Sequence, residues 1–100
     1  MNGLLVVLYL LGANFPICTE TTNSQNCPTT IYANNQYYVF WYDCRYYAQN
    51  STYAIFGSRV TTGGTVLDYN GKELFRDSSY LKLSCAYDGI NFMVVARNGC

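Results

Sequence analysis

The residues of this chain best suited to chemistry are its five cysteines, since the sequence contains no histidine. Without histidine, a serine or cysteine nucleophile lacks its usual general base. The six acidic residues are scattered along the chain, and no two of them have a spacing that suggests general acid–base catalysis. The sequence therefore predicts a protein that is not an enzyme.

The spacing of the cysteines does not fit a metal site either. They contain no Cys-x-x-Cys pair and stand far apart, as Cys18, Cys27, Cys44, Cys85 and Cys100. Small zinc sites use closely spaced ligand pairs, so disulfide formation is the expected chemistry of these thiols. The glycine-rich stretches TTGG and GTVLDYNG precede no predicted helix and so do not predict a phosphate site. We expect neither a metal nor a cofactor.

Composition indicates one small domain in an oxidising compartment. A chain of 100 residues forms a single domain with a small core, and five cysteines in so short a chain favour an environment where disulfides persist. The net charge is zero, which gives no electrostatic attraction toward nucleic acid or an anionic membrane surface. We therefore expect neither of these as a partner.

Residues 1–13 predict a secretory signal peptide, because Leu4–Leu11 form an uninterrupted apolar run closed by Gly12 and Ala13. The run is shorter than the roughly 20 residues that cross a bilayer, so we expect no membrane span. The sequon at Asn50 predicts glycosylation of a surface loop in an exported protein. In the alternative interpretation, the apolar run is retained as a buried strand.

The rest of the chain divides into a polar arm and a strand-rich domain. Residues 14–36 are rich in Thr, Asn and Ser and predict an irregular arm, with a candidate short strand near Thr30–Tyr32. Residues 37–100 form the predicted domain and begin with YYVFWYDCRYY, whose aromatic and β-branched residues are typical of a strand. The period of two predicts that even-numbered residues, Cys44 among them, face the core.

The odd-numbered face of this aromatic strand is the candidate binding face. We expect it to present Val39, Trp41 and Tyr47, because aromatic side chains offer a large contact area at little entropic cost. Asp43 and Arg45 share the same face, and their spacing predicts an ion pair at the surface.

Two dipeptides predict hairpins, since Asn-Gly and Asp-Gly readily adopt the positive φ angles of a type I′ turn. A two-residue turn at Asp88-Gly89 sets Cys85 opposite Phe92 and gathers the apolar residues of both arms on one face. A turn at Asn70-Gly71 pairs the arms TVLDY and KELF. With YYVFWYDCRYY and TYAIFGSRV these arms make six strands, and the segment near Thr30–Tyr32 is a candidate seventh. The pattern predicts an all-β fold, either a β-sandwich or a small barrel.

Several short motifs carry a resemblance to a known family. An apolar leader ends in ICT, a CP pair is followed by IY and by an aromatic FWY strand, and YLKLSCAYDGINFMVVAR closes the chain. This order resembles the secreted accessory proteins encoded by the eighth open reading frame of SARS-related coronaviruses. The resemblance implies a small disulfide-linked, immunoglobulin-like β-sandwich. The chain departs from that family by having fewer cysteines and by lacking its long insertion before the final strands.

The pairing of the cysteines can be read in two ways. Strand facing alone brings Cys44 and Cys85 onto inward faces and allows a bridge between them. The resemblance instead implies a bridge between Cys27 and Cys85, which leaves Cys44 to pair with Cys100. Cleavage after Ala13 would then leave Cys18 unpaired and predicts an intermolecular disulfide there, whereas cleavage after Cys18 leaves four cysteines with three connectivities.

The resemblance implies a secreted viral protein that modulates host immune factors by binding an extracellular or cell-surface protein. A different function class is also open at this point. In that alternative the chain is a subunit of an extracellular fibre, and its N-terminal apolar strand completes the sheet of a neighbouring subunit. Both readings allow homo-oligomers.

Overall fold

The computed structural model describes residues 6–10, 13–20, 22–78 and 81–98 of the 100-residue chain. The described residues form eight strands and one short helix. In chain order they are β1 Val6–Leu10, β2 Ala13–Cys18, β3 Gln25–Ala33, β4 Gln36–Asp43, α1 Tyr47–Asn50, β5 Tyr53–Thr61, β6 Lys72–Asp77, β7 Leu81–Tyr87 and β8 Phe92–Asn98. The predicted all-β fold is confirmed, with more strands than the six or seven expected.

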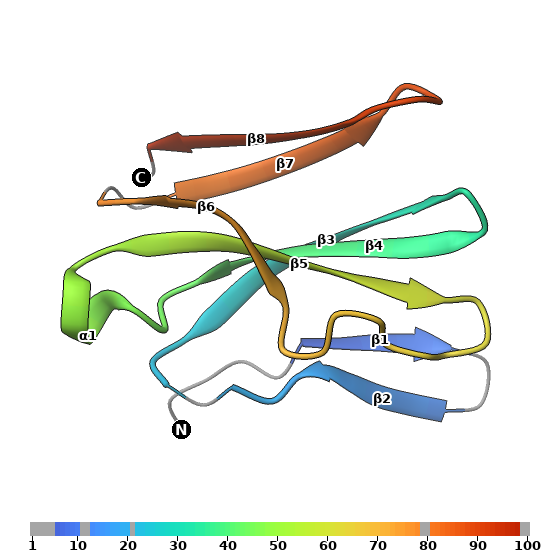
Figure 1. Cartoon of the computed structure of the whole chain (residues 1–100), viewed down its shortest axis with the longest axis horizontal. Coiled ribbons are helices and arrows are strands. Elements are labelled where there is room, and N and C mark those ends of the chain that lie inside the picture. The colour runs from blue at the N-terminus through green and yellow to red at the C-terminus, as the bar shows by residue number, and fades with distance from the viewer. Residues whose placement is uncertain (1–5, 11–12, 21, 79–80, 99–100) are drawn as a thin grey trace.

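The strands form three antiparallel sheets arranged as layers. β3, β4, β5 and β6 make a central four-stranded sheet in that order, while β1–β2 and β7–β8 are separate two-stranded sheets. Figure 1 shows the β7–β8 hairpin on one side of the central sheet and β1–β2 on the other. The fold therefore has a cover on each face of the sheet that contains β4.

The segment predicted as an irregular arm contains ordered strand. β3 pairs with β4 from Gln25↔Asp43 to Ala33↔Gln36, and the two are joined by a two-residue turn. Asn34 and Asn35 form that turn with φ angles of 52° and 58°, as a type I′ hairpin requires. Asparagine tolerates this region because its short polar side chain can bond locally. The irregular-arm prediction was therefore wrong for residues 25–33, since polar Thr and Asn suit an edge strand as well as a loop.

The apolar run near the N-terminus also forms a strand. β1 pairs with β2 of the same chain, from Leu10↔Ala13 to Val6↔Cys18 with one irregularity. In the structure, therefore, described residues of the predicted leader take the retained-strand form of the alternative interpretation.

The Asp88-Gly89 hairpin forms, with a register different from the prediction. Tyr87 pairs with Phe92 and Cys85 with Val94, so the loop has four residues rather than two. The Asp88 carboxylate accepts hydrogen bonds from the backbone N–H groups of Ile90 and Asn91, at 2.9 and 2.8 Å, and this stabilises the longer loop. A shift of two residues keeps each side chain on its predicted face, because the strand repeat is also two.

The Asn70-Gly71 hairpin does not form. Both residues have the expected positive φ, at 65° and 88°, but β6 pairs with β5 instead of with the segment before Asn70. That preceding segment contributes only an isolated bridge between Val60 and Val66. The residue types predicted the turn conformation correctly, but the predicted pairing of β6 with the segment before Asn70 was wrong.

Candidate binding groove

The predicted binding face on β4 is buried. Val39 is 2% exposed and Trp41 is 0% exposed, and both pack against Ile17 and Cys18 of β2. Tyr47 lies elsewhere, on α1, and is 47% exposed. The prediction of a joint binding face was therefore wrong. Periodicity assigned the odd-numbered side chains to one face of β4 as far as Asp43, but it did not show that β1–β2 would cover that face.

The Asp43–Arg45 pair is likewise inside the molecule rather than at the surface. The Asp43 side chain is fully buried, and its carboxylate accepts hydrogen bonds from the Trp41 indole N–H at 2.9 Å and from the Arg45 guanidinium at 2.8 and 2.9 Å. The backbone N–H of Arg45 donates a further bond to it at 2.9 Å. A buried carboxylate needs such complete pairing, because removing a charge from water is costly.

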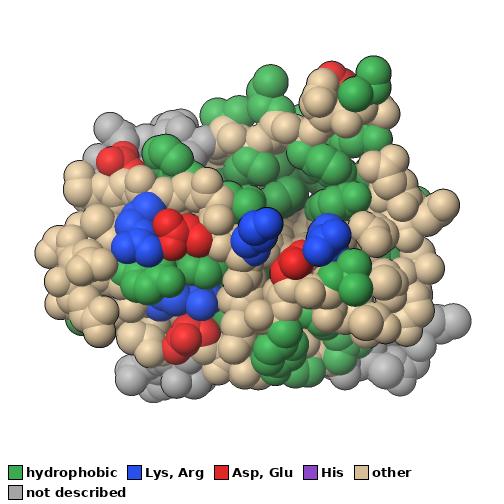
Figure 2. All heavy atoms as spheres, in the orientation of Figure 1, with side chains coloured by type: hydrophobic (Ala, Val, Ile, Leu, Met, Phe, Trp, Pro, Cys, Tyr) green, Lys and Arg blue, Asp and Glu red, His purple; other side chains and the backbone are tan. Residues whose placement is uncertain are grey.

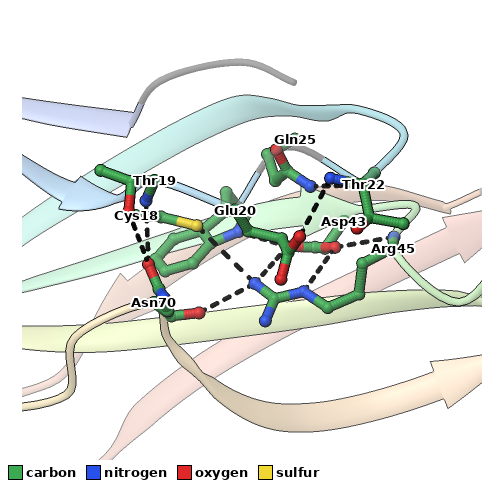
Figure 3. Close-up of polar contacts among 9 residues, drawn as sticks. Cys18, Thr19, Glu20, Thr22, Gln25, Asp43, Arg45 and Asn70 are labelled. Atoms are coloured by element: carbon green, nitrogen blue, oxygen red, sulfur yellow. Dashed lines mark hydrogen bonds and ion pairs between the residues drawn. The ribbon is translucent and has the colours of Figure 1, made fainter. Parts of the chain in front are cut away.

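Arg45 extends this network toward the N-terminal cover (Figure 3). Its Nη2 donates to the backbone oxygen of Asn70 at 2.8 Å and lies 3.7 Å from the Cys18 Sγ. The guanidinium also stacks over the ring of Phe56, 3.9 Å from its centroid. Burial alone lowers the pKa of Arg45, but the hydrogen bonds and charge of Asp43 outweigh it and the net pKa is raised.

Asn70 explains why its turn serves packing instead of a hairpin. Its backbone N–H donates to the Ile17 oxygen at 2.9 Å, and its side-chain oxygen accepts from the Thr19 N–H at 2.8 Å. Gly71 lies directly against Trp41, since an added Cβ would come within 2.5 Å of the indole ring. The Asn70-Gly71 turn therefore fastens β2 to the central sheet.

The four cysteines within the described residues are free thiols. Cys18 is buried, Cys27 is exposed, and Cys44 and Cys85 are half-buried. Neither the predicted Cys27–Cys85 bridge nor the alternative Cys44–Cys85 bridge is formed. The prediction that Cys44 pairs with Cys100 involves a residue that lies outside the described residues. Cys85 Sγ instead donates a hydrogen bond to the Thr29 hydroxyl at 3.6 Å.

The surroundings of two of these thiols differ sharply. Burial raises the pKa of Cys18, and the backbone hydrogen bond at Glu20 and the guanidinium of Arg45 only partly oppose this. Cys27 lies at the irregularity of β3 with a positive φ of 55°, exposed to solvent. An intermolecular disulfide therefore has a more accessible thiol at Cys27 than at Cys18, the residue predicted from the sequence.

Three further findings bear on the expectations from sequence. Asn50, the predicted glycosylation residue, is exposed at the end of α1. Among the described residues, no three His, Cys, Asp or Glu side chains gather closely enough to hold a metal ion. Within the same residues, no helix is long and apolar enough to cross a membrane.

An open, apolar hollow lies on the opposite face of the central sheet, between β6 and the β7–β8 hairpin. It comprises two adjoining cavities of about 440 and 300 Å³, which share Leu74 of β6 and Phe92 and Val94 of β8. We call this the β6–β8 groove. Figure 2 shows hydrophobic side chains filling the region above a row of alternating basic and acidic ones. Leu74 is 48% exposed and Phe75 is 50% exposed, so the groove opens to solvent.

A glycine forms part of the groove floor. An added Cβ at Gly57 would lie 2.9 Å from a Phe40 ring carbon and 3.1 Å from a Leu74 methyl carbon. Both distances are shorter than ordinary van der Waals contact, so the missing side chain is what allows Phe40 and Leu74 to meet above β5. The groove therefore depends on a backbone position without a side chain.

Charged residues border one end of the groove. Arg59 and Asp68 form a salt bridge at 2.9 Å, and Lys72 lies beside them. The hydrogen bond from Arg59 lowers the pKa of Asp68, so this carboxylate stays ionised at neutral pH. The arrangement suits an apolar segment with polar ends.

Sequence reasoning did not identify this groove. Leu74 and Phe75 were assigned to a hairpin arm, where each was expected to face a residue of the preceding segment. The useful signal was the adjacent apolar pair LF between charged residues in KELFRD, since both side chains of such a pair cannot face the same core in a regular strand.

Comparison with known proteins returned no match. No family model fits the chain, and neither a curated protein nor a solved structure is significantly similar to it.

Proposed function

We propose that this chain is a non-enzymatic binding protein that accepts an apolar segment of a protein partner in the β6–β8 groove. The observation that carries the proposal is the half-exposed pair Leu74 and Phe75 beside a cavity of about 440 Å³. Apolar grooves of this kind, bordered by a few charged residues, are typical of binding sites. The partner gains by burying apolar side chains, while the Arg59–Asp68 pair meets its polar flanks.

We further propose that the protein is exported and that its partner is an extracellular or cell-surface host factor. This part rests on the leader-like residues 1–13 and on the resemblance to coronavirus accessory proteins of immunoglobulin-like fold. If export removes a leader, cleavage after Ala13 removes β1 and keeps most of β2, whereas cleavage after Cys18 removes both strands. Ile17 and Cys18 are both 0% exposed and pack on Trp41, so losing them would open the core.

The pairing of β1 bears on the alternative of a fibre subunit. Strand donation needs an N-terminal strand that lacks a partner in its own chain. β1 pairs with β2 of the same chain, so a donor strand would first have to leave that sheet. This observation favours the binding protein over the fibre subunit.

The binding proposal is tested by placing a charge in the groove. We expect Leu74→Asp to abolish capture of a host protein that the wild-type chain retains from serum or cell-surface extract, since a carboxylate cannot be buried against Phe92 and Val94 without large cost. Mass spectrometry identifies the retained protein, and mass spectrometry of the secreted chain itself shows whether residues 1–13 are absent.

The matched control is Val95→Asp. Val95 is 50% exposed on β8, and it is not among the residues that line the groove. We expect this variant to retain the same host protein as wild type. Equal capture by wild type and Leu74→Asp, or equal loss in both variants, would show that the groove is not the binding site.

A further inference from the structure

β6 forms an open edge of the central sheet. Within the described residues, its inner side pairs with β5 and no strand pairs with its outer side. Five of its six residues, Lys72 to Arg76, are exposed, and Asp77 is half-buried. An edge strand with free backbone groups and exposed apolar side chains readily pairs with another strand.

The opposite edge of the same sheet carries the features that prevent such pairing. β3 contains Pro28, which has no backbone N–H, and its ladder is interrupted between Asn26 and Thr29. Prolines and bulges are the usual means of blocking an edge strand. β6 contains no proline, so the two edges differ in their capacity to add a strand.

We propose that β6 is a self-association edge, at which two copies of this chain pair antiparallel about a two-fold axis and extend their central sheets into one. The sequence of β6, KELFRD, carries the charge complementarity that this pairing needs. Read in opposite directions, it sets Lys72 against Asp77 of the second copy and Glu73 against Arg76 of the second copy. The apolar pair Leu74–Phe75 meets its own equivalent at the centre.

β6 contains a bulge at Leu74, and this bulge makes the proposed register compatible with two-fold symmetry. In an antiparallel pair, directly opposed residues lie on the same face, and a two-fold axis normal to the sheet passes between equivalent positions. A regular six-residue strand has no central residue through which the axis could pass. Placing the axis at Leu74 would oppose Lys72 with Arg76, and placing it at Phe75 would oppose Glu73 with Asp77, so both registers bring like charges together. A regular strand of the sequence KELFRD, without a bulge, would therefore disfavour the dimer.

The observed pairing with β5 removes this obstacle. Phe75 pairs with Ile55 and Glu73 with the next residue, Phe56, so that Leu74 is an extra residue. β6 thus has five ladder positions, with Leu74–Phe75 together in the middle. Lys72 and Asp77 then lie on one face, and Glu73 and Arg76 on the other, as opposed pairs across a two-fold axis require.

Three of the four charged residues needed for the interchain pairs, Lys72, Glu73 and Arg76, are exposed, and Asp77 is half-buried. Glu73 and Arg76 already form a salt bridge at 2.6 Å within one chain, and their side chains are 35% and 32% exposed, so a second copy can share the contact. No carboxylate of the described residues forms a salt bridge with Lys72, which leaves it available to Asp77 of the second copy. Each dimer would contain two Glu73–Arg76 and two Lys72–Asp77 contacts.

The symmetry has a consequence for the β6–β8 groove. An axis normal to the sheet keeps both β7–β8 hairpins on the same side, and each groove is bordered by Leu74 and Phe75 next to the axis. The two grooves would then flank the dimer axis on one face. This consequence depends on the proposed function, whereas the pairing of β6 does not.

Charge reversal tests the pairing without touching the groove. We expect wild type to form dimers in sedimentation equilibrium over a micromolar to millimolar concentration series, with reductant present to exclude disulfide-linked species. Glu73→Arg and Arg76→Glu each place like charges across the axis, and we expect each to weaken self-association about tenfold or more.

Mixing the two variants provides the matched control. A chain with Glu73→Arg has two arginines where a chain with Arg76→Glu has two glutamates, so the mixture restores opposite charges across the axis. We expect heterodimers in the mixture, detected by native mass spectrometry. Each variant has lost its intrachain salt bridge, so recovery on mixing cannot come from that bridge, and circular dichroism confirms that both variants fold.

Three results would overturn the proposal: a wild type that stays monomeric throughout the series, single variants that dimerise as wild type does, or a mixture that forms no heterodimer. Failure of the groove proposal is a separate result, because Leu74 and Phe75 are unchanged in these variants and partner capture can be measured on their monomers.

Discussion

The two faces of the central sheet differ in how completely they are covered. On the face toward β1–β2, Trp41, Asp43 and Val39 are at most 2% exposed, and a network of hydrogen bonds closes the edge of the contact. On the face toward β7–β8, the hairpin covers Tyr42 and Ile55 but leaves Leu74 and Phe75 about half exposed. The same strands therefore contribute to a closed core on one side and to an open groove on the other.

Two arginine–aspartate pairs show the same contrast. The Arg45–Asp43 pair has side-chain exposures of 12% and 0%, whereas the Arg59–Asp68 pair has 50% and 19%. Both contacts are short, at 2.8 and 2.9 Å, so distance does not distinguish them. Burial does, because water screens the exposed pair and leaves the buried one dependent on its protein partners.

Breaking the buried pair should give the largest effect. We expect Asp43→Ala to reduce the free energy of unfolding by about 3–5 kcal/mol, since it leaves the Arg45 charge and the Trp41 indole N–H without their acceptor. Urea unfolding followed by the fluorescence of Trp41, the single tryptophan of the chain, measures the change.

Asp68→Ala is the matched control for this loss, because it removes the same contact from the open face. We expect its effect to be a small fraction of that of Asp43→Ala. Equal losses in the two variants would mean that the β1–β2 side is as accessible to water as the groove side.

The next effect concerns the groove floor. We expect Gly57→Ala to reduce stability by about 1–3 kcal/mol, because the new methyl group would push Phe40 and Leu74 apart. Gly63→Ala serves as control, since its nearest neighbour is the Thr61 hydroxyl at 3.9 Å. Both substitutions restrict the unfolded chain equally, so the difference between them reports the packing alone. A difference near zero would show that the floor of the groove can rearrange.

The sequence predicted the local structure better than the layers. Turn dipeptides and aromatic periodicity identified β4, β5, β7 and β8, and Phe40 and Tyr42 on the even-numbered side of β4 are buried as expected. The odd-numbered side was assigned to solvent because its cover, β1–β2, lies in a segment that reads as a leader and an arm. A period of two separates the faces of a strand but does not tell which of them another layer covers.

Long-range contacts account for the remaining differences. Asn70-Gly71 has the φ angles that its residue types predict, but contacts with Ile17, Thr19 and Trp41 determine what the turn connects. β6 contains a bulge at Leu74, and no residue type in KELFRD specifies one. Such features arise from the fit between layers, which a local pattern does not contain.

The smallest expected effect is a pH dependence from the closed face. Burial raises the folded-state pKa of Cys18 above its unfolded value, which is about 8.5 for an ordinary thiol. The stabilising contribution of the neutral thiol is therefore fully present below that value, and it is lost as the pH rises toward the folded-state pKa.

We expect the urea midpoint of wild type to fall more steeply than that of Cys18→Ala between about pH 8 and pH 9.5. Cys27→Ala is the control, because it removes a thiol from the exposed irregularity of β3 instead of from the closed face. Reductant keeps all thiols free, so the difference between the slopes of wild type and Cys18→Ala reports the Cys18 thiol. Parallel slopes for wild type and Cys18→Ala would mean that water reaches the thiol beneath β1–β2, and the contrast between a closed and an open face would then no longer hold.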